Sequence, residues 1–322
     1  MLKDILILGI IVAMRMLPAQ IPEVEASEQP FKLSATAELV LLDVRVKDAA
    51  GEHISNLSKD NFKVYDDGKL QRITQFASDD LPVTVGLVID TSGSMRSKYA
   101  DVVTAALSFI QASNREDEMF VVNFGDHVRS GLPDEVPFTA DIRQLRTALS
   151  WGKPEGRTAL YDAILFSLRH IEKGRSERKA LLLVSDGGDN SSTHGAEEVM
   201  RMVQESRATI YAIGIFDADD PDRNPALLRR LAHVSGGEVF FPEQLSEVLS
   251  ICRQIANDIR TRYTIAYVPV RSGEQGSVRK IRVAASTSNG HKLIVHTRTS
   301  YVLPPQRFLA DPDGEPHRKR GL

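Results

Sequence analysis

The sequence contains almost no cysteine, and this limits the chemistry available to the protein. Cys252 is the single cysteine among 322 residues, so the chain cannot form an internal disulfide or a zinc cluster held by several thiolates. Any bound metal must therefore be held by oxygen or histidine ligands. Cys252 lies within a helical repeat of apolar residues, which predicts a small buried side chain rather than a reactive thiol.

A strong excess of either charge is also missing. The chain has 40 Lys and Arg residues against 43 Asp and Glu residues, and its net charge is −3. Without a long basic block, this balance argues against a protein that binds nucleic acid through the phosphates. The composition, 42% hydrophobic and 26% charged, is that of a globular protein and excludes collagen-like and wholly disordered chains. At roughly 150 residues per domain, the length predicts about two domains.

The N-terminal apolar run, from Ile5 to Met14, is shorter than the roughly 20 residues that a membrane-spanning helix needs. It follows Lys3 and precedes small residues near Ala19, which is the order of a secretory signal peptide. We therefore predict a signal peptide at residues 1–19 and an acidic linker at 20–34. We therefore expect the protein to be exported to the periplasm, the cell exterior or the cell envelope. After cleavage of the signal peptide, it is expected to have no stable membrane span. A buried first strand or a retained membrane anchor is the alternative.

Alternation of apolar and polar residues in the two flanks predicts antiparallel strands. Apolar residues recur with period two from Val40 to Val46, and similar runs separated by turn residues fill 35–80 and 261–303. Neither flank has enough strands to close a stable sandwich alone. We therefore predict one small β-sandwich built from both flanks, with residues 81–260 inserted as a second domain. The last residues, 304–322, read as a disordered tail.

Continuous apolar strands alternate with helical periods in the inserted segment. Strands are expected at 83–90, 119–125, 179–186 and 208–215, and helices at 98–113, 140–149, 159–172, 195–206, 225–234 and 244–259. Strands that are apolar on both faces fit a sheet covered by helices on both sides. The predicted fold class is therefore α/β, with a doubly wound, mostly parallel sheet. Ligands of such sheets bind beyond the carboxyl ends of the strands, beside the switch in strand order.

Short polar side chains stand where ligands of such a sheet would bind. Asp90, Ser92 and Ser94 follow the first strand, Thr158 precedes a helix, and Asp186 follows the third strand. Two carboxylates and three hydroxyls form a set of hard oxygen ligands that suits Mg²⁺, with Mn²⁺ or Ca²⁺ as substitutes. A set of capped turns without an ion is the alternative, because Ser, Thr and Asp are also favoured helix caps.

The inserted segment resembles a von Willebrand factor type A (VWA) domain with a metal-ion-dependent adhesion site. The family motif, Asp-x-Ser-x-Ser with a separated Thr and a separated Asp, falls on those five residues. The resemblance implies a Rossmann-like domain in which the hydroxyls coordinate the ion directly and one or both aspartates act through water. It also implies that the open coordination position takes an Asp or Glu from a partner protein. The flanks resemble bacterial secreted proteins with a VWFA-related domain.

These features predict an exported, non-enzymatic adhesion or scaffold module that binds another protein through an acidic side chain. Met95, Arg157 and Asp189 are predicted to contribute to the partner-binding rim. Many relatives carry Gly at the position of Arg157. Its guanidinium either repels the cation, pairs with an incoming carboxylate or points to solvent. Trp151, just before the threonine loop, is expected to pack in the core.

Two other functions stay open for a domain of this kind. A metal-assisted hydrolase would use the ion to activate water, but it needs a general base, and no His or Glu lies in the segments 90–95, 156–158 and 186–190. A VWA subunit working with an ATPase partner would be intracellular, which residues 1–20 oppose. No catalytic residue and no organic cofactor is predicted.

Overall fold

The computed structural model describes residues 39–78, 80–216, 222–269, 276–287 and 290–303. The predicted signal peptide, the linker and the C-terminal tail lie outside these described residues. Within them, none of the helices combines the length and the apolar character needed to cross a membrane.

The inserted segment contains a six-stranded sheet with the strand order β10-β9-β8-β5-β6-β7. Its strands are β5 (Val83–Asp90), β6 (Glu118–Phe124), β7 (Val128–Ser130), β8 (Arg178–Ser185), β9 (Thr209–Gly214) and β10 (Val239–Phe240). All neighbouring pairs are parallel except β6 and β7. The four central strands are buried along their whole length, as expected for strands covered on both faces.

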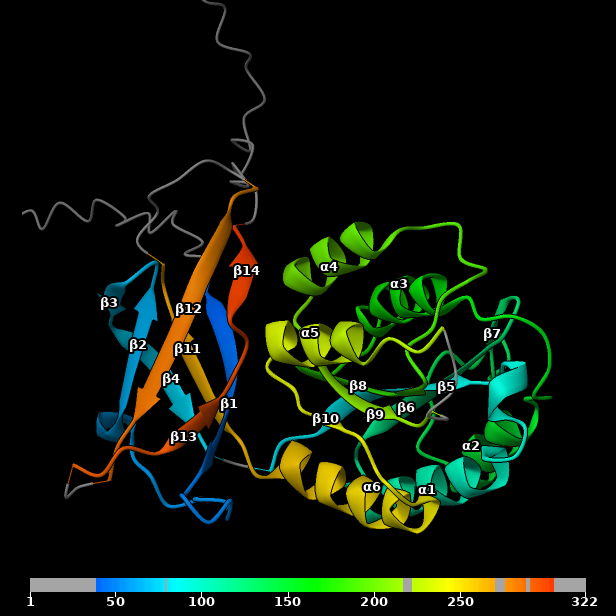
Figure 1. Cartoon of the computed structure of the whole chain (residues 1–322). Coiled ribbons are helices and arrows are strands. Elements are labelled where there is room, and N and C mark those ends of the chain that lie inside the picture. The colour runs from blue at the N-terminus through cyan, green and yellow to red at the C-terminus, as the bar shows by residue number, and fades with distance from the viewer. Residues whose placement is uncertain (1–38, 79, 217–221, 270–275, 288–289, 304–322) are drawn as a thin grey trace, which may run out of the picture. The chain divides into compact units, whose positions relative to one another are not determined.

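Among the described residues, six α-helices cover this sheet. They are α1 (Tyr99–Ala112), α2 (Ile142–Ser150), α3 (Leu160–Ile171), α4 (Ala196–Glu205), α5 (Pro225–Ser235) and α6 (Leu245–Arg260). Helices α1, α2 and α6 lie on one face and α3, α4 and α5 on the other (Figure 1). The predicted doubly wound fold class is therefore confirmed, and every predicted helix boundary lies within two residues of the observed one. Cys252 is buried in α6, and burial raises the pKa of its thiol to about 12.

Two four-stranded antiparallel sheets are built from the flanks. One has the order β13-β1-β11-β4, with β1 (Val40–Lys47), β4 (Ile73–Ala77), β11 (Tyr263–Tyr267) and β13 (Ile294–His296). The other has the order β14-β12-β2-β3, with β2 (Phe62–Asp66), β3 (Lys69–Gln71), β12 (Val278–Ala285) and β14 (Ser300–Val302). Apolar side chains from both sheets form one core. Each sheet thus contains strands from both flanks.

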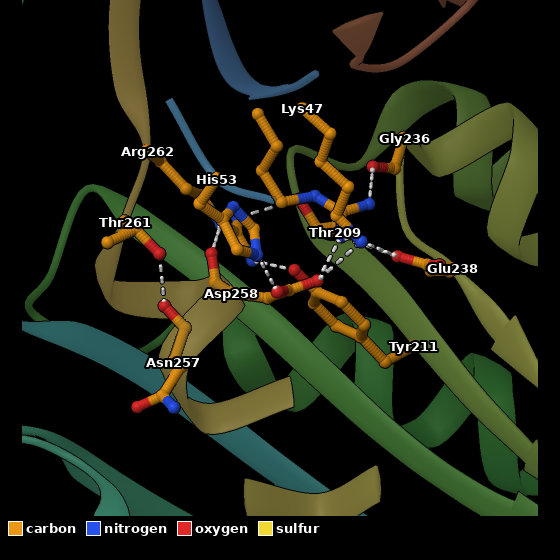
Figure 2. A network of polar contacts seen from close by, with 11 residues as sticks. Lys47, His53, Thr209, Tyr211, Gly236, Glu238, Asn257, Asp258, Thr261 and Arg262 are labelled. Carbon is orange, nitrogen blue, oxygen red and sulfur yellow. Dashed lines mark hydrogen bonds and ion pairs between the residues drawn. The ribbon is translucent and has the colours of Figure 1, made fainter. Parts of the chain in front are cut away.

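A buried polar network joins β1 to α6 (Figure 2). The Arg45 guanidinium donates to the Asp258 carboxylate at 2.5 Å, to the Glu238 carboxylate at 3.1 Å and to the Gly236 carbonyl at 3.2 Å. The His53 ring contacts the second oxygen of Asp258. Because both Arg45 and Asp258 are withdrawn from water, each depends on the other for charge compensation.

Candidate metal centre

Asp90 ends β5, the strand at which the strand order of the sheet reverses. Strand β6 lies on one side of β5, and β8 and then β9 lie on the other. The Asp90 side chain is fully buried. One carboxylate oxygen accepts from the Ser92 backbone N–H at 2.9 Å, and the other from the Ser185 hydroxyl at 2.7 Å. Burial and the nearby charge of Asp186 raise the pKa of Asp90 to about 7. No positively charged side chain among the described residues forms an ion pair with this carboxylate.

Asp186 comes from the adjacent strand end and meets the same loop. Strands β5 and β8 pair in parallel register, so their carboxyl ends lie at one edge of the sheet. The Ser94 hydroxyl donates to Asp186 Oδ2 at 2.7 Å and lies 3.1 Å from the Ser92 hydroxyl. The Gly188 backbone N–H donates to the other Asp186 oxygen at 2.9 Å. Four of the five predicted ligands therefore form one hydrogen-bonded cluster.

Thr158 is held between the other two loops. Its carbonyl accepts from the backbone N–H groups of Asn190 and Ser191, each at 3.0 Å, and its own N–H donates to the Asn190 side chain at 2.9 Å. On the other side, the Gly93 N–H donates to the Gly156 carbonyl at 3.1 Å. The Thr158 hydroxyl makes no hydrogen bond with a described residue, so its oxygen is available to a ligand.

The three predicted rim residues have different environments. The prediction for Met95 is wrong, because a short 3₁₀ turn, Gly93–Met95, directs this apolar side chain into the core, where it is fully buried. Arg157 is exposed, and its guanidinium donates to the Asn190 carbonyl. Asp189 accepts from the Tyr161 N–H at 3.1 Å and from the Ser192 hydroxyl at 2.5 Å. It therefore shapes its own loop and the first turn of α3.

Three residues near the site were missed or misplaced by sequence reasoning. The Ser185 hydroxyl donates a hydrogen bond to Asp90. Its position directly before Asp186, at the end of a strand, could have indicated that it belongs to the site. Asp126 accepts from the Arg157 N–H at 2.8 Å; it follows β6 and therefore reaches the same sheet edge. Trp151 is 68% exposed rather than part of the core, because it stands at the C-cap of α2.

The donor set fits a hard divalent cation. Neither Asp90 nor Asp186 forms an ion pair with a described residue, yet both carboxylates are buried. No group of three or more His, Cys, Asp or Glu side chains suited to a metal occurs in the described part of the chain. A metal would therefore need the hydroxyl oxygens as well as the two carboxylates, and an all-oxygen set of this kind suits Mg²⁺ better than a soft metal.

Comparison with known proteins finds two bacterial relatives, both named as uncharacterized. The protein sll0103 of Synechocystis sp. is 26% identical over 180 residues, which cover 54% of this chain and 41% of that protein. YfbK of Escherichia coli is 26% identical over 179 residues, which cover 54% of this chain and 31% of that protein. The matched segment therefore covers less than half the length of either relative.

A solved structure and a family model agree with the observed fold. The von Willebrand factor type A structure from Catenulispora acidiphila has a TM-score of 0.50 and 15% identity, and the alignment covers 83% of this chain and 74% of that one. The model of the von Willebrand factor type A domain family matches residues 84–254. That match spans more than half of the chain and contains all five residues of the candidate site. The chain therefore belongs to the von Willebrand factor type A domain family.

Proposed function

We propose that this protein is an exported, non-enzymatic binding module in which one divalent cation, Mg²⁺ by preference, joins it to an acidic side chain of a partner protein. Its ligands are the five oxygen-bearing side chains that the three loops bring together: Asp90, Ser92, Ser94, Thr158 and Asp186. The observation that carries the proposal is the 2.7 Å hydrogen bond between Ser94 and Asp186. It supports the proposal because it holds the loops after β5 and β8 side by side, as a shared ion would require.

The charges in the site favour an acidic ligand. The carboxylates of Asp90 and Asp186 balance the two charges of a divalent cation, and the hydroxyls add none. When bound, the cation would supply an open coordination position that attracts a further oxygen ligand. A carboxylate from an Asp or Glu of the partner has the hardness and the charge that such an ion prefers.

A binding role agrees better than hydrolysis with the groups around the site. Each carboxylate oxygen of Asp90 already accepts a hydrogen bond, and so does each oxygen of Asp186. These hydrogen bonds hold both carboxylates in fixed positions, as metal ligands require. A general base must lie within hydrogen-bond reach of the water that it activates, and no His or Glu occurs in the segments 90–95, 156–158 and 186–190.

Calorimetric titration of the purified protein with Mg²⁺ tests the site. The wild type should bind one equivalent, whereas Asp90→Ala and Asp186→Ala should lose binding while keeping the circular dichroism of the folded domain. Asp134→Ala is the matched control, because Asp134 is an exposed acid outside the site. Mg²⁺ binding that persists in both site variants would overturn the metal centre.

A second experiment tests what the metal does. Retention of envelope proteins on the immobilised wild type should be lost in EDTA and in Asp186→Ala, and restored by added Mg²⁺ in the wild type alone. Retention that survives both treatments would exclude a metal bridge. Metal-dependent turnover of phosphoester, ester or peptide substrates would instead favour the hydrolase.

Export has its own test. Residues 1–19 have the charged start, short apolar run and small-residue end of a cleaved signal. Mass spectrometry of the protein from its native host should find Gln20 as the first residue. A cytosolic protein that keeps residues 1–19 would overturn export without affecting the metal centre.

A further inference from the structure

A groove of about 570 Å³ follows α3 away from the candidate metal centre. Helix α3 and the residues just beyond it line the groove at three- and four-residue spacings from Ala159 to Lys173, which places them on one helix face. The loop after β6 and the segment before α4 form its other walls. The groove therefore runs along one face of α3.

One end of this groove is continuous with the site. Ala159 directly follows Thr158, and the Ser191 N–H donates to the Thr158 carbonyl at 3.0 Å. Asp126, another lining residue, accepts from the Arg157 N–H at 2.8 Å. A chain segment that places a carboxylate at the metal would thus pass directly into the groove.

The acids of the groove are engaged by neighbouring groups. Asp162 accepts from the His194 ring at 2.6 Å and from the backbone N–H of Thr193 at 3.0 Å. Two cations at the far end are less constrained: Arg169 approaches Glu198 only at 3.9 Å, and Lys173 forms no ion pair with a described residue. Both are exposed. The far end therefore presents positive charge to an incoming chain.

Phe166 gives the middle of the groove an apolar surface. Its side chain is 37% exposed and stacks on His170 with the ring centroids 5.8 Å apart. His170 is fixed in turn, because it packs against Phe120 and Phe138 and contacts the Pro137 carbonyl at 2.9 Å. A surface that is already ordered loses little side-chain entropy when a ligand binds.

We propose that this groove binds the partner segment adjacent to the metal-bound carboxylate, and that the segment is an extended acidic peptide with a second carboxylate. This inference rests on the proposed function. From Ala159 to Arg169, α3 rises about 15 Å at 1.5 Å per residue. An extended chain covers that distance in about four or five residues. The ligand class is therefore a peptide with two acids about four residues apart and an apolar side chain between them.

Fluorescence anisotropy with three labelled octapeptides tests this proposal. The first carries an Asp, a central Leu and a Glu four residues after the Asp; the second has Gln in place of the Glu; the third has Asn in place of the Asp. In Mg²⁺ the first should bind about tenfold more tightly than the second, a difference of about 1.4 kcal/mol. The third should bind no more tightly than the second, because its single Glu can occupy either the metal or the far end of the groove but not both, and EDTA should abolish all binding.

Variants locate the contacts. Phe166→Ala and Arg169→Glu should each weaken the first peptide by about tenfold, equal to about 1.4 kcal/mol, and Arg169→Glu should leave the second peptide unchanged. Leu70→Ala and Arg230→Glu are matched controls, because both residues are exposed and lie outside the groove. Neither control should alter binding.

The outcomes separate the two proposals. Equal Mg²⁺-dependent affinities for the first two peptides, unaffected by the groove variants, would refute peptide binding in the groove. The proposed metal bridge would remain supported. Failure of the first peptide to bind in Mg²⁺ would overturn the metal-bridged carboxylate and the groove together. A change in self-association in the groove variants, without a change in peptide affinity, would assign the groove to a second copy of the chain.

Discussion

The Arg45 guanidinium in β1 donates to the Asp258 carboxylate in α6 at 2.5 Å, although the two residues are 213 positions apart in the sequence. Both are buried. The pair connects a strand of the sandwich with the last helix of the VWA domain, and His53 and Glu238 extend it into the network of Figure 2. We expect a buried pair of this kind to couple the stability of the sheet that contains β1 to that of α6.

Removal of one partner should therefore be costly. Asp258→Ala leaves the Arg45 charge without its closest buried partner, and we expect the free energy of unfolding to fall by about 3–5 kcal/mol. Denaturant titration followed by circular dichroism measures this loss. The double variant Arg45→Met/Asp258→Leu should recover most of it, since apolar residues can replace a buried ion pair. A loss below about 1 kcal/mol in Asp258→Ala would show that the pair is not a stabilising link.

The raised pKa of Asp90 predicts how the metal-free protein responds to pH. The folded state holds this proton up to about pH 7, whereas the unfolded chain releases it near 3.8. Because the folded state binds the proton more tightly, the free energy of unfolding should fall as pH rises from about 4 to about 7, by at most about 4 kcal/mol. Saturating Mg²⁺ should offset the fall, because the ion binds the ionised carboxylate.

Thermal unfolding in EDTA and in Mg²⁺, at about pH 5 and about pH 8, is the measurement. Asp90→Asn is the control, since it removes the titrating group and should reduce the pH dependence of the metal-free protein. Wild type and Asp90→Asn with the same pH dependence in EDTA would contradict the assignment to Asp90.

Gly156 should be required for the threonine loop. Its φ of +78° is unfavourable for other residues, and an added Cβ would collide with the Asp126 carboxylate. We expect Gly156→Ala to displace Thr158 and to weaken Mg²⁺ binding by about tenfold or more, a cost in the range of about 1–3 kcal/mol for such backbone strain. Gly195→Ala is the matched control, because nothing lies within 4 Å of its added Cβ. Equal Mg²⁺ affinities in the two variants, measured by calorimetry, would refute this role.

Trp151 is the single tryptophan of the chain, so its fluorescence reports on one position. Being 68% exposed, it should be quenched by acrylamide in the folded protein nearly as strongly as in the unfolded chain. Trp151→Phe should change the free energy of unfolding by less than about 0.5 kcal/mol, as for other surface substitutions. Strong protection from acrylamide would place the indole in a packed environment instead.

Much of the fold follows from sequence periodicity. The helical repeats predict α1 to α6 because each buries one apolar face, and the apolar strands β5, β6, β8 and β9 are recognisable because they are buried along their length. Asp90 and Asp186 could be assigned to one edge for the same reason, since the carboxyl ends of parallel neighbours coincide. Local sequence patterns are therefore sufficient to place a residue whose position depends only on where a strand or helix ends.

Tertiary context determined what sequence reasoning missed. Residues 69–77 look like one alternating strand, but β3 pairs with β2, whereas β4 pairs with β11 in the other sheet. Met95 follows Ser94 directly, yet one 3₁₀ turn separates a core side chain from a candidate ligand. The Arg45–Asp258 pair leaves no local signal, because no periodicity relates residues so far apart.

Each of the two antiparallel sheets contains strands from both flanks, and this limits the order in which the protein can fold during synthesis. The VWA domain has all of its strands and helices once Arg260 has been made. Strand β1 must wait for β11 and β13, its two neighbours, whereas β2 can pair with β3 at once but must wait for β12. Since domains fold as units while the ribosome is still adding residues, the VWA domain can fold first. Strand β1 therefore acquires its sheet partners only after the whole inserted segment has been made.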